Sequence, residues 1–265
     1  GVDGAARALA LGDGRYPCRL PNMPFQTQRY WLETPPRSGR RGGHPLLGER
    51  VDTPLLPRGG ALFVQQLSPQ ALALLTHHRV FGQIVLPAAG HVEMALAAIA
   101  DRFPHGGWLR DVTIHRALVL PPEEALPVQL VMEAQGEHHT FTLHSQNGED
   151  WQRHTSGELV AGSLAPAQAI DLTALRQRCA QVLDPEEYYR LTRSVGIEHG
   201  EHFQALTGLW QGEREVLARL ELPPPLHSGA GAFQLHPVLL DAAFQMVGVP
   251  LLNRSSPYLP VGMDA

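Results

Sequence analysis

An apolar helix enclosed by strand-forming segments is the feature that most constrains how this chain can fold. Pro87 can begin the helix because its fixed φ angle suits a first helical turn, and Pro104 ends it. Between them, Val92, Leu96 and Ile99 recur at the spacing of one helix face. We therefore expect this helix to be buried among other elements.

The segments around the helix have the composition of antiparallel strands. Residues 128–135 alternate apolar and polar side chains, which indicates a strand with one buried face. Asn147 and Gly148 indicate a tight turn between two strands. Strands are predicted at residues 61–67, 80–86, 108–120, 128–135, 139–146 and 153–160. One long helix wrapped by an antiparallel sheet is the hotdog arrangement.

The second half of the chain repeats this plan loosely, without detectable sequence repetition. Helices are predicted at residues 172–179, 185–194 and 237–247, and strands at residues 203–211 and 216–222. The predicted fold is therefore α+β, a double hotdog. Only about 18 residues follow the last helix, so the second half is expected to be incomplete at its C-terminal end.

Composition shifts suggest where the parts of the chain meet. Residues 33–43 contain only Pro, Gly, Ser, Thr and charged side chains, which favours an extended linker. We predict a linker at residues 1–43, an N-terminal hotdog at 44–160, a second linker at 161–175 and a truncated C-terminal hotdog at 176–265.

Charge and cysteine content exclude several classes of protein. A net charge of -5 offers no basic stripe for a phosphate backbone, so no nucleic-acid partner is expected. No apolar run approaches the roughly 20 residues that cross a bilayer, and no signal sequence is evident. We expect no membrane association, a cytoplasmic location and free thiols at Cys18 and Cys179.

His78 is the first candidate for chemistry. It lies on a predicted apolar strand and is followed by Gly82 and Pro87 in the spacing HxxxGxxxxP. An imidazole in an apolar wall stays neutral and can remove a weakly acidic proton. The glycine lets the backbone approach a substrate, and the proline presents the N–H groups of a helix start to developing negative charge.

A second candidate segment begins at His236, with the spacing HPxxxDxxxQ. Asp241 lies there on an apolar helix face, where it can act as an acid if its surroundings keep it protonated. Gln245 is one turn further on, so its amide is predicted to hydrogen-bond the Asp241 carboxyl and fix its rotamer.

Together, the two spacings resemble the motifs of the dehydratase domains of modular polyketide synthases and of related animal-type fatty acid synthases. The HPLLG sequence at residues 44–48 resembles the start of these domains, and residues 1–43 look like the segment that follows an acyltransferase domain. The resemblance covers about residues 20–265 and implies that the chain is one piece of a longer multidomain polypeptide.

The resemblance also implies a reaction and its residues. The reaction removes water from a 3-hydroxyacyl thioester carried on the phosphopantetheine of an acyl carrier protein, and it needs no bound cofactor. His78 is implied as the general base, Asp241 as the proton donor to the leaving hydroxyl and Gln245 as the partner of Asp241. Gly82 and Pro87 are implied to contact substrate. Further implied partners are neighbouring synthase domains and a second copy in a homodimer.

A third family motif, YGP followed two residues later by phenylalanine, is altered in this chain. Its counterpart reads His199-Gly200-Glu201-His202-Phe203, so the glycine and phenylalanine are present while the tyrosine and proline are not. We expect His199, Gly200 and Phe203 to bind substrate, with His199 donating a hydrogen bond to the hydroxyl that leaves.

Three alternatives follow from these residues. The altered third motif is compatible with a catalytically silent structural domain, and the same fold supports dehydrating cyclases and double-bond isomerases. The histidine pairs at residues 77–78 and 138–139, with His199 and His202, raise the question of a metal site. We expect none, because no cysteine or carboxylate falls at the usual zinc spacing.

Overall fold

The computed structural model describes residues 43–136, 138–163, 168–251 and 260–263, all within a unit that spans residues 39–265. Residues 1–42, which include Cys18, lie outside the described residues, so the N-terminal linker stays a prediction. Cys179 is buried as a free thiol, as predicted. No helix in the described ranges is long and apolar enough to cross a membrane.

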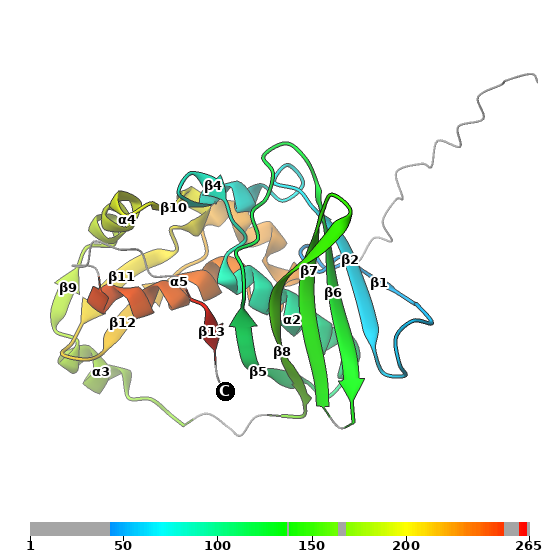
Figure 1. Cartoon of the computed structure of the whole chain (residues 1–265). Coiled ribbons are helices and arrows are strands. Elements are labelled where there is room, and N and C mark those ends of the chain that lie inside the picture. The colour runs from blue at the N-terminus through cyan, green and yellow to red at the C-terminus, as the bar shows by residue number, and fades with distance from the viewer. Residues whose placement is uncertain (1–42, 137, 164–167, 252–259, 264–265) are drawn as a thin grey trace, which may run out of the picture. The chain divides into compact units, whose positions relative to one another are not determined.

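A seven-stranded antiparallel sheet forms the first half of the fold (Figure 1). Its order is β1-β2-β6-β7-β8-β5-β13. The strands are β1 (Glu49–Val51), β2 (Ala61–Leu67), β5 (Gly107–Ile114), β6 (Leu126–Gln135), β7 (His138–Asn147), β8 (Asp150–Ala161) and β13 (Gly262–Met263). Strand β13, from the end of the chain, pairs with β5. The predicted turn at Asn147-Gly148 joins β7 to β8.

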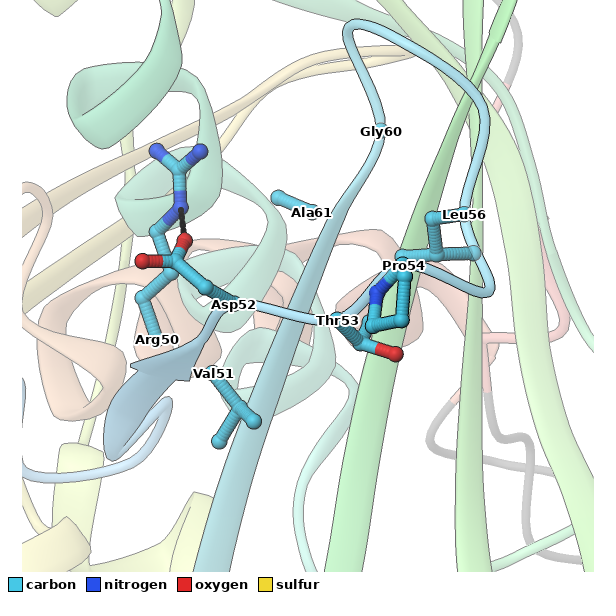
Figure 2. A pocket seen from close by; sticks show the side chains of 8 residues that line it. All are labelled: Arg50, Val51, Asp52, Thr53, Pro54, Leu56, Gly60 and Ala61. Carbon is cyan, nitrogen blue, oxygen red and sulfur yellow. Dashed lines mark ion pairs between the residues drawn. The ribbon is translucent and has the colours of Figure 1, made fainter.

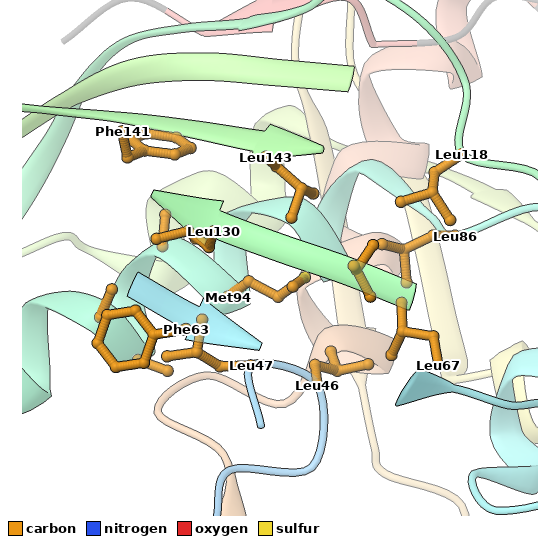
Figure 3. Close-up of a cluster of buried hydrophobic side chains, with 14 of the residues drawn as sticks. Leu46, Leu47, Phe63, Leu67, Leu86, Met94, Leu118, Leu130, Phe141 and Leu143 are labelled. Carbon is orange, nitrogen blue, oxygen red and sulfur yellow. The ribbon is translucent and has the colours of Figure 1, made fainter. Parts of the chain in front are cut away.

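Helix α2 (Ala88–Arg102) is the predicted buried helix, and it packs on this sheet against β5, β8 and β6. Ten of its fifteen residues are buried, so it is covered on almost every side. Met94 of α2 lies among leucine and phenylalanine side chains that alternate along the strands (Figure 3). Burying one large apolar side chain contributes about 1.5–3 kcal/mol to the free energy of unfolding, so this core is the main source of stability in the first half.

The second half contains a smaller sheet of order β12-β11-β9 and several helical segments. The strands are β9 (Gln181–Leu183), β11 (Leu206–Gln211) and β12 (Val216–Leu220). The segments are α3 (Leu172–Arg178), α4 (Pro185–Ser194), the 3₁₀ helix η3 (Pro224–Ala232) and α5 (Pro237–Gly248), followed by η4 (Val249–Leu251). Helix α5 packs on β12 and on α2, so the central helices of the two halves are in contact.

A third sheet joins the two halves. It has the order β10-β3-β4 and consists of β3 (His78–Val80), β4 (Gln83–Ile84) and β10 (Ile197–His199). Short 3₁₀ segments precede β3 and follow β10: η1 (Ala73–His77) and η2 (Glu201–Phe203). The double hotdog predicted from the sequence is therefore the observed fold.

Three strand predictions were wrong in their extent. The predicted strand 80–86 is a hairpin, because Phe81 and Gly82 both adopt positive φ angles and reverse the chain. The predicted strand 108–120 ends at Ile114, after a register shift that surrounds Asp111 at a φ of 52°. The predicted strand 203–211 begins only at Leu206, because the Phe203 N–H closes a 3₁₀ turn onto the Gly200 carbonyl.

Buried polar groups connect α2 to β8 at the side of the core. His91 Nδ1 lies 2.5 Å from Thr155 Oγ1, and both residues are buried. Burial, with a smaller contribution from nearby His154, lowers the pKa of His91 to about 3. The imidazole of His91 is therefore kept neutral in the folded chain, whereas in the unfolded chain its pKa has the ordinary value of 6.5.

This difference makes stability depend on pH. The unfolded chain protonates His91 below the ordinary value of 6.5 and the folded chain only below about 3. The contribution of His91 to the free energy of unfolding is therefore expected to be constant above pH 6.5. As the pH drops from 6.5 toward 3, this contribution should fall by at most about 1.4 kcal/mol per pH unit. Urea unfolding at several pH values across this range measures how the free energy of unfolding changes with pH. This free energy should change less with pH in His91→Gln than in the unchanged chain. An equal change with pH in the two proteins would contradict the assignment.

Candidate active site

Pairing of β3 with β10 places two histidines opposite each other. The register sets Ile197 against Val80 and His199 against His78, so the two imidazoles project from neighbouring positions of one small sheet. Their ring centroids are 5.8 Å apart, and both side chains are buried. The predicted base and the altered residue of the third motif therefore share one site.

The backbone of its own hairpin orients the His78 ring. His78 Nδ1 lies 2.8 Å from the Val85 carbonyl oxygen, which can only accept, so Nδ1 carries the hydrogen. The unprotonated Nε2 is then free to act as a base. Gly82 at a φ of 78° allows this hairpin turn, because its lack of a Cβ makes a left-handed conformation inexpensive.

Asp241 reaches the same site from the second half. His236 caps α5, with its Nδ1 accepting from the Val238 N–H at 3.3 Å, and Pro237 occupies the first turn. Asp241 follows one turn later and is buried. Gln245 Nε2 donates to Asp241 Oδ2 at 2.7 Å, so the predicted hydrogen bond between these side chains is confirmed.

His199 lies close to both of the other groups. Its Nε2 is 3.8 Å from Asp241 Oδ2, and one side-chain ligand atom each from His78, His199 and Asp241 lies within 4.8 Å of the others. Burial lowers the pKa of His199 to about 4, against the opposing effect of Asp241. The ring is therefore neutral at neutral pH, and the three side chains form one buried cluster.

The other predicted site residues have clear structural surroundings. Phe203 is fully buried, with its ring 5.4 Å from the His78 ring. Gly200 donates its N–H to the His77 carbonyl at 2.7 Å, and a Cβ there would lie 2.6 Å from His77 Nδ1, so only glycine fits. Pro87 is buried and is the N-cap of α2.

Gly82 lies apart from the other predicted site residues. It is exposed at the tip of the hairpin, and its carbonyl accepts a hydrogen bond from Arg79. Its predicted substrate contact, like that of the other residues named from the motifs, stays a prediction.

Sequence reasoning missed Glu93, the polar residue that holds the two halves in register. This carboxylate of α2 is fully buried. It accepts from His44 Nε2 at 2.8 Å, from the Gln234 N–H at 2.7 Å and from the Leu235 N–H at 2.8 Å. Leu235 directly precedes the cap of α5, so Glu93 fixes where the helix of Asp241 begins. A carboxylate in the middle of the apolar helix, between Val92 and Met94, was the signal that could have revealed it.

Two tyrosines of α4 were also missed. Tyr189 accepts the Leu206 N–H at 3.1 Å, and its ring lies 5.7 Å from the His199 ring. Tyr188 donates to the Gln245 carbonyl at 3.2 Å. Burial raises the pKa of Tyr189 to about 12, so its phenol stays protonated at neutral pH. The ring of Tyr189 packs against that of His199.

Two surface depressions of the described structure lie outside this cluster. One, of about 260 Å³, is lined by the β1–β2 segment, and in it Arg50 faces Asp52 at 3.8 Å (Figure 2). The other, of about 490 Å³, is lined by residues near the β7–β8 turn. Neither lining includes His78, His199 or Asp241, so the chemistry of the candidate site does not depend on either depression.

Comparisons with known proteins agree with the geometry. The family model described as a polyketide synthase dehydratase domain matches residues 44–146, and the one described as a polyketide synthase dehydratase N-terminal domain matches residues 167–265. The chain is 35% identical to polyketide synthase GfsE of Streptomyces halstedii over 94% of this chain and 7% of that protein. It thus spans a small part of that relative.

Solved structures resemble the fold over most of its length. The dehydratase domain from the CurF module of curacin polyketide synthase is 33% identical, with a TM-score of 0.79 over 84% of this chain and 82% of that one. Two CurK dehydratase structures, each 32% identical, are described as inactive mutants. One has histidine changed to phenylalanine, with a TM-score of 0.79 over 83% of this chain and 81% of that one. The other has aspartate changed to asparagine, with a TM-score of 0.78 over 83% and 82%.

The role given to Glu93 leads to a stability prediction. In Glu93→Gln an amide NH₂ must face N–H donors that the carboxylate now satisfies, so the free energy of unfolding is expected to drop by about 2–4 kcal/mol. Urea unfolding measures this change. Glu133→Gln, on an exposed position of β6, is the matched control and should leave the midpoint unchanged. Equal midpoints for the two variants would contradict the role of Glu93.

Proposed function

This chain belongs to the dehydratase domains of polyketide synthases, and we propose that it eliminates water from a 3-hydroxyacyl thioester to give the α,β-unsaturated thioester. One observation carries the mechanism. Ligand atoms of His78 from the first half and Asp241 from the second lie within 4.8 Å of each other in a buried site. A base and an acid at this separation can act on adjacent carbons of one substrate.

His78 is the proposed base. Its Nε2 takes the α-proton, while the Val85 carbonyl accepts the Nδ1 hydrogen and supports the imidazolium that forms. The electron pair of the broken C–H bond forms the new C=C bond. A neutral imidazole suits this step, because it can accept a proton at neutral pH without first losing one.

Asp241 is the proposed acid. It protonates the β-hydroxyl, so the C–O bond breaks with water as the leaving group. The hydrogen bond from Gln245 holds the carboxyl in place during this transfer. After water leaves, the site holds an imidazolium and a carboxylate within 4.8 Å, and one bridging water can return the proton from His78 to Asp241.

His199 is proposed to orient the hydroxyl. The Thr192 hydroxyl can donate to the Tyr189 carbonyl at 3.2 Å, which leaves its oxygen free to accept from His199 Nδ1 at 3.5 Å. In this tautomer His199 Nε2 accepts the hydroxyl hydrogen and turns the oxygen toward Asp241. The sequence suggested a donor at this position, whereas these contacts favour an acceptor.

The names of relatives support the proposed roles and partners. The inactive CurK mutants change a histidine and an aspartate, the residue types proposed here. The curated relatives are multidomain synthases, which supports neighbouring synthase domains as partners. We further propose a substrate tethered by phosphopantetheine to an acyl carrier protein, a homodimer within the synthase and no bound cofactor.

Replacing the proposed base or acid should abolish most turnover. His78→Ala and Asp241→Asn are each expected to lower kcat about 10²–10⁴-fold on a 3-hydroxyacyl thioester surrogate, because each removes one partner of the acid–base pair. Mass spectrometry of the unsaturated product measures the rate. His105→Ala and Asp150→Asn, both at exposed positions, are matched controls expected to retain full activity. Turnover that persists in both site variants, or is absent from the unchanged chain, would refute the proposal.

Loss of the proposed hydrogen bond at His199 should have a smaller effect. His199→Phe keeps an aromatic ring against Tyr189 but cannot accept the hydroxyl hydrogen, so kcat is expected to fall about 10–100-fold. The same product assay tests this, with far-UV circular dichroism to verify the fold. Unchanged kcat in a folded variant would remove His199 from the mechanism.

A further inference from the structure

His78, His199 and Asp241, the three residues of the proposed dehydration, also have the chemistry of metal ligands. Two imidazoles and one carboxylate converge from three segments far apart in the sequence, with ligand atoms within 4.8 Å of one another and all three side chains buried. The sequence prediction of no metal site relied on local spacing, which cannot detect donors that folding alone brings together. Two histidines and one carboxylate are a common ligand set for borderline divalent ions.

Contacts behind the donors resemble the outer contacts of metal sites. Ligating histidines usually donate the other ring N–H to a carbonyl or carboxylate, and His78 Nδ1 does so to Val85. His199 Nδ1 lies 3.5 Å from the Thr192 hydroxyl, so its Nε2 also faces inward. Gln245 holds the Asp241 carboxyl. All three donors are therefore oriented before any ligand arrives.

We propose that these three side chains bind one zinc-class divalent ion, which leaves its fourth position open and blocks dehydration while it is bound. Bonds of about 2.0–2.1 Å in a tetrahedral site set donors roughly 3.4 Å apart. His199 Nε2 and Asp241 Oδ2, at 3.8 Å, are close to this spacing. A pair at the outer limit of 4.8 Å must close by about 1.4 Å, which side-chain rotation can supply.

The third donor exists because of a change in the third motif. The family motif has a tyrosine where this chain has His199, and a phenol that titrates near 10 is a poor ligand at neutral pH. With the imidazole of His199, the acid–base pair of His78 and Asp241 becomes a site with three possible metal ligands. Because the ion occupies both the proposed base and the proposed acid, its binding excludes the proton transfers.

Calorimetric titration of the 265-residue chain with zinc chloride tests binding without reference to activity. We expect one equivalent to bind, and the X-ray absorption spectrum of the zinc-loaded chain to contain two imidazole nitrogens. His199→Tyr, which introduces the residue of the family motif, should weaken binding at least about 100-fold. Asp241→Asn should weaken it to a similar degree.

The control is His202→Gln, three residues from His199. His202 stacks on His77 with ring centroids 4.0 Å apart, so this pair also brings two imidazoles close together. We expect unchanged zinc affinity in this variant. The proposal is overturned if the unchanged chain shows no saturable binding, if a folded His199→Tyr variant binds as tightly as the unchanged chain, or if His202→Gln abolishes binding. These outcomes are separate from turnover, so the dehydratase assignment can stand or fall independently.

Discussion

The antiparallel pairing of β3 with β10 is the contact on which the site depends. β3 belongs to the first half and β10 to the second, and their main-chain register alone sets His199 against His78. A slip of one residue would turn the side chains of one strand to the opposite face and separate the two imidazoles. The buried side chains of Val80 and Ile197 oppose such a slip, because it would expose them.

Asp241 needs a second constraint, because a helix can slide along its neighbour while a paired strand cannot. That constraint is polar. Glu93 accepts two main-chain N–H groups of the loop before α5, and the His236 cap then sets the first turn of the helix. Leaving such a buried acceptor unpaired costs free energy, so a shift of α5 that broke these hydrogen bonds would be unfavourable. Apolar packing alone would tolerate a small shift of the helix. The carboxyl of Asp241 is thereby fixed relative to α2.

The extent to which sequence predicted this architecture differs between elements for physical reasons. Helix α4 was predicted at its observed bounds, and α5 within one residue, because proline starts and apolar periodicity are local signals. The hairpin at Phe81 was missed because phenylalanine rarely adopts a φ of 49°, and because Gly82 was interpreted as a substrate contact and not as part of a turn. The approach of His78 to Asp241 was inferred only from motif resemblance. The position of His199 opposite His78 follows from strand pairing, which local patterns do not encode.

His199 stands where the motif that this chain resembles has a tyrosine, and an imidazole offers different chemistry there from a phenol. A phenol offers one hydroxyl that both donates and accepts, whereas a neutral imidazole offers one donor and one lone pair on opposite edges. With Nδ1 directed at Thr192, the lone pair of Nε2 faces the substrate space. Burial keeps His199 neutral, so the cluster avoids a second cation when His78 becomes protonated. Repulsion between two cations is thereby avoided during the proposed dehydration. The same geometry directs one nitrogen of each histidine inward, beside the carboxylate of Asp241. The proposed metal binding therefore depends on the same two imidazoles and one carboxylate as the proposed dehydration.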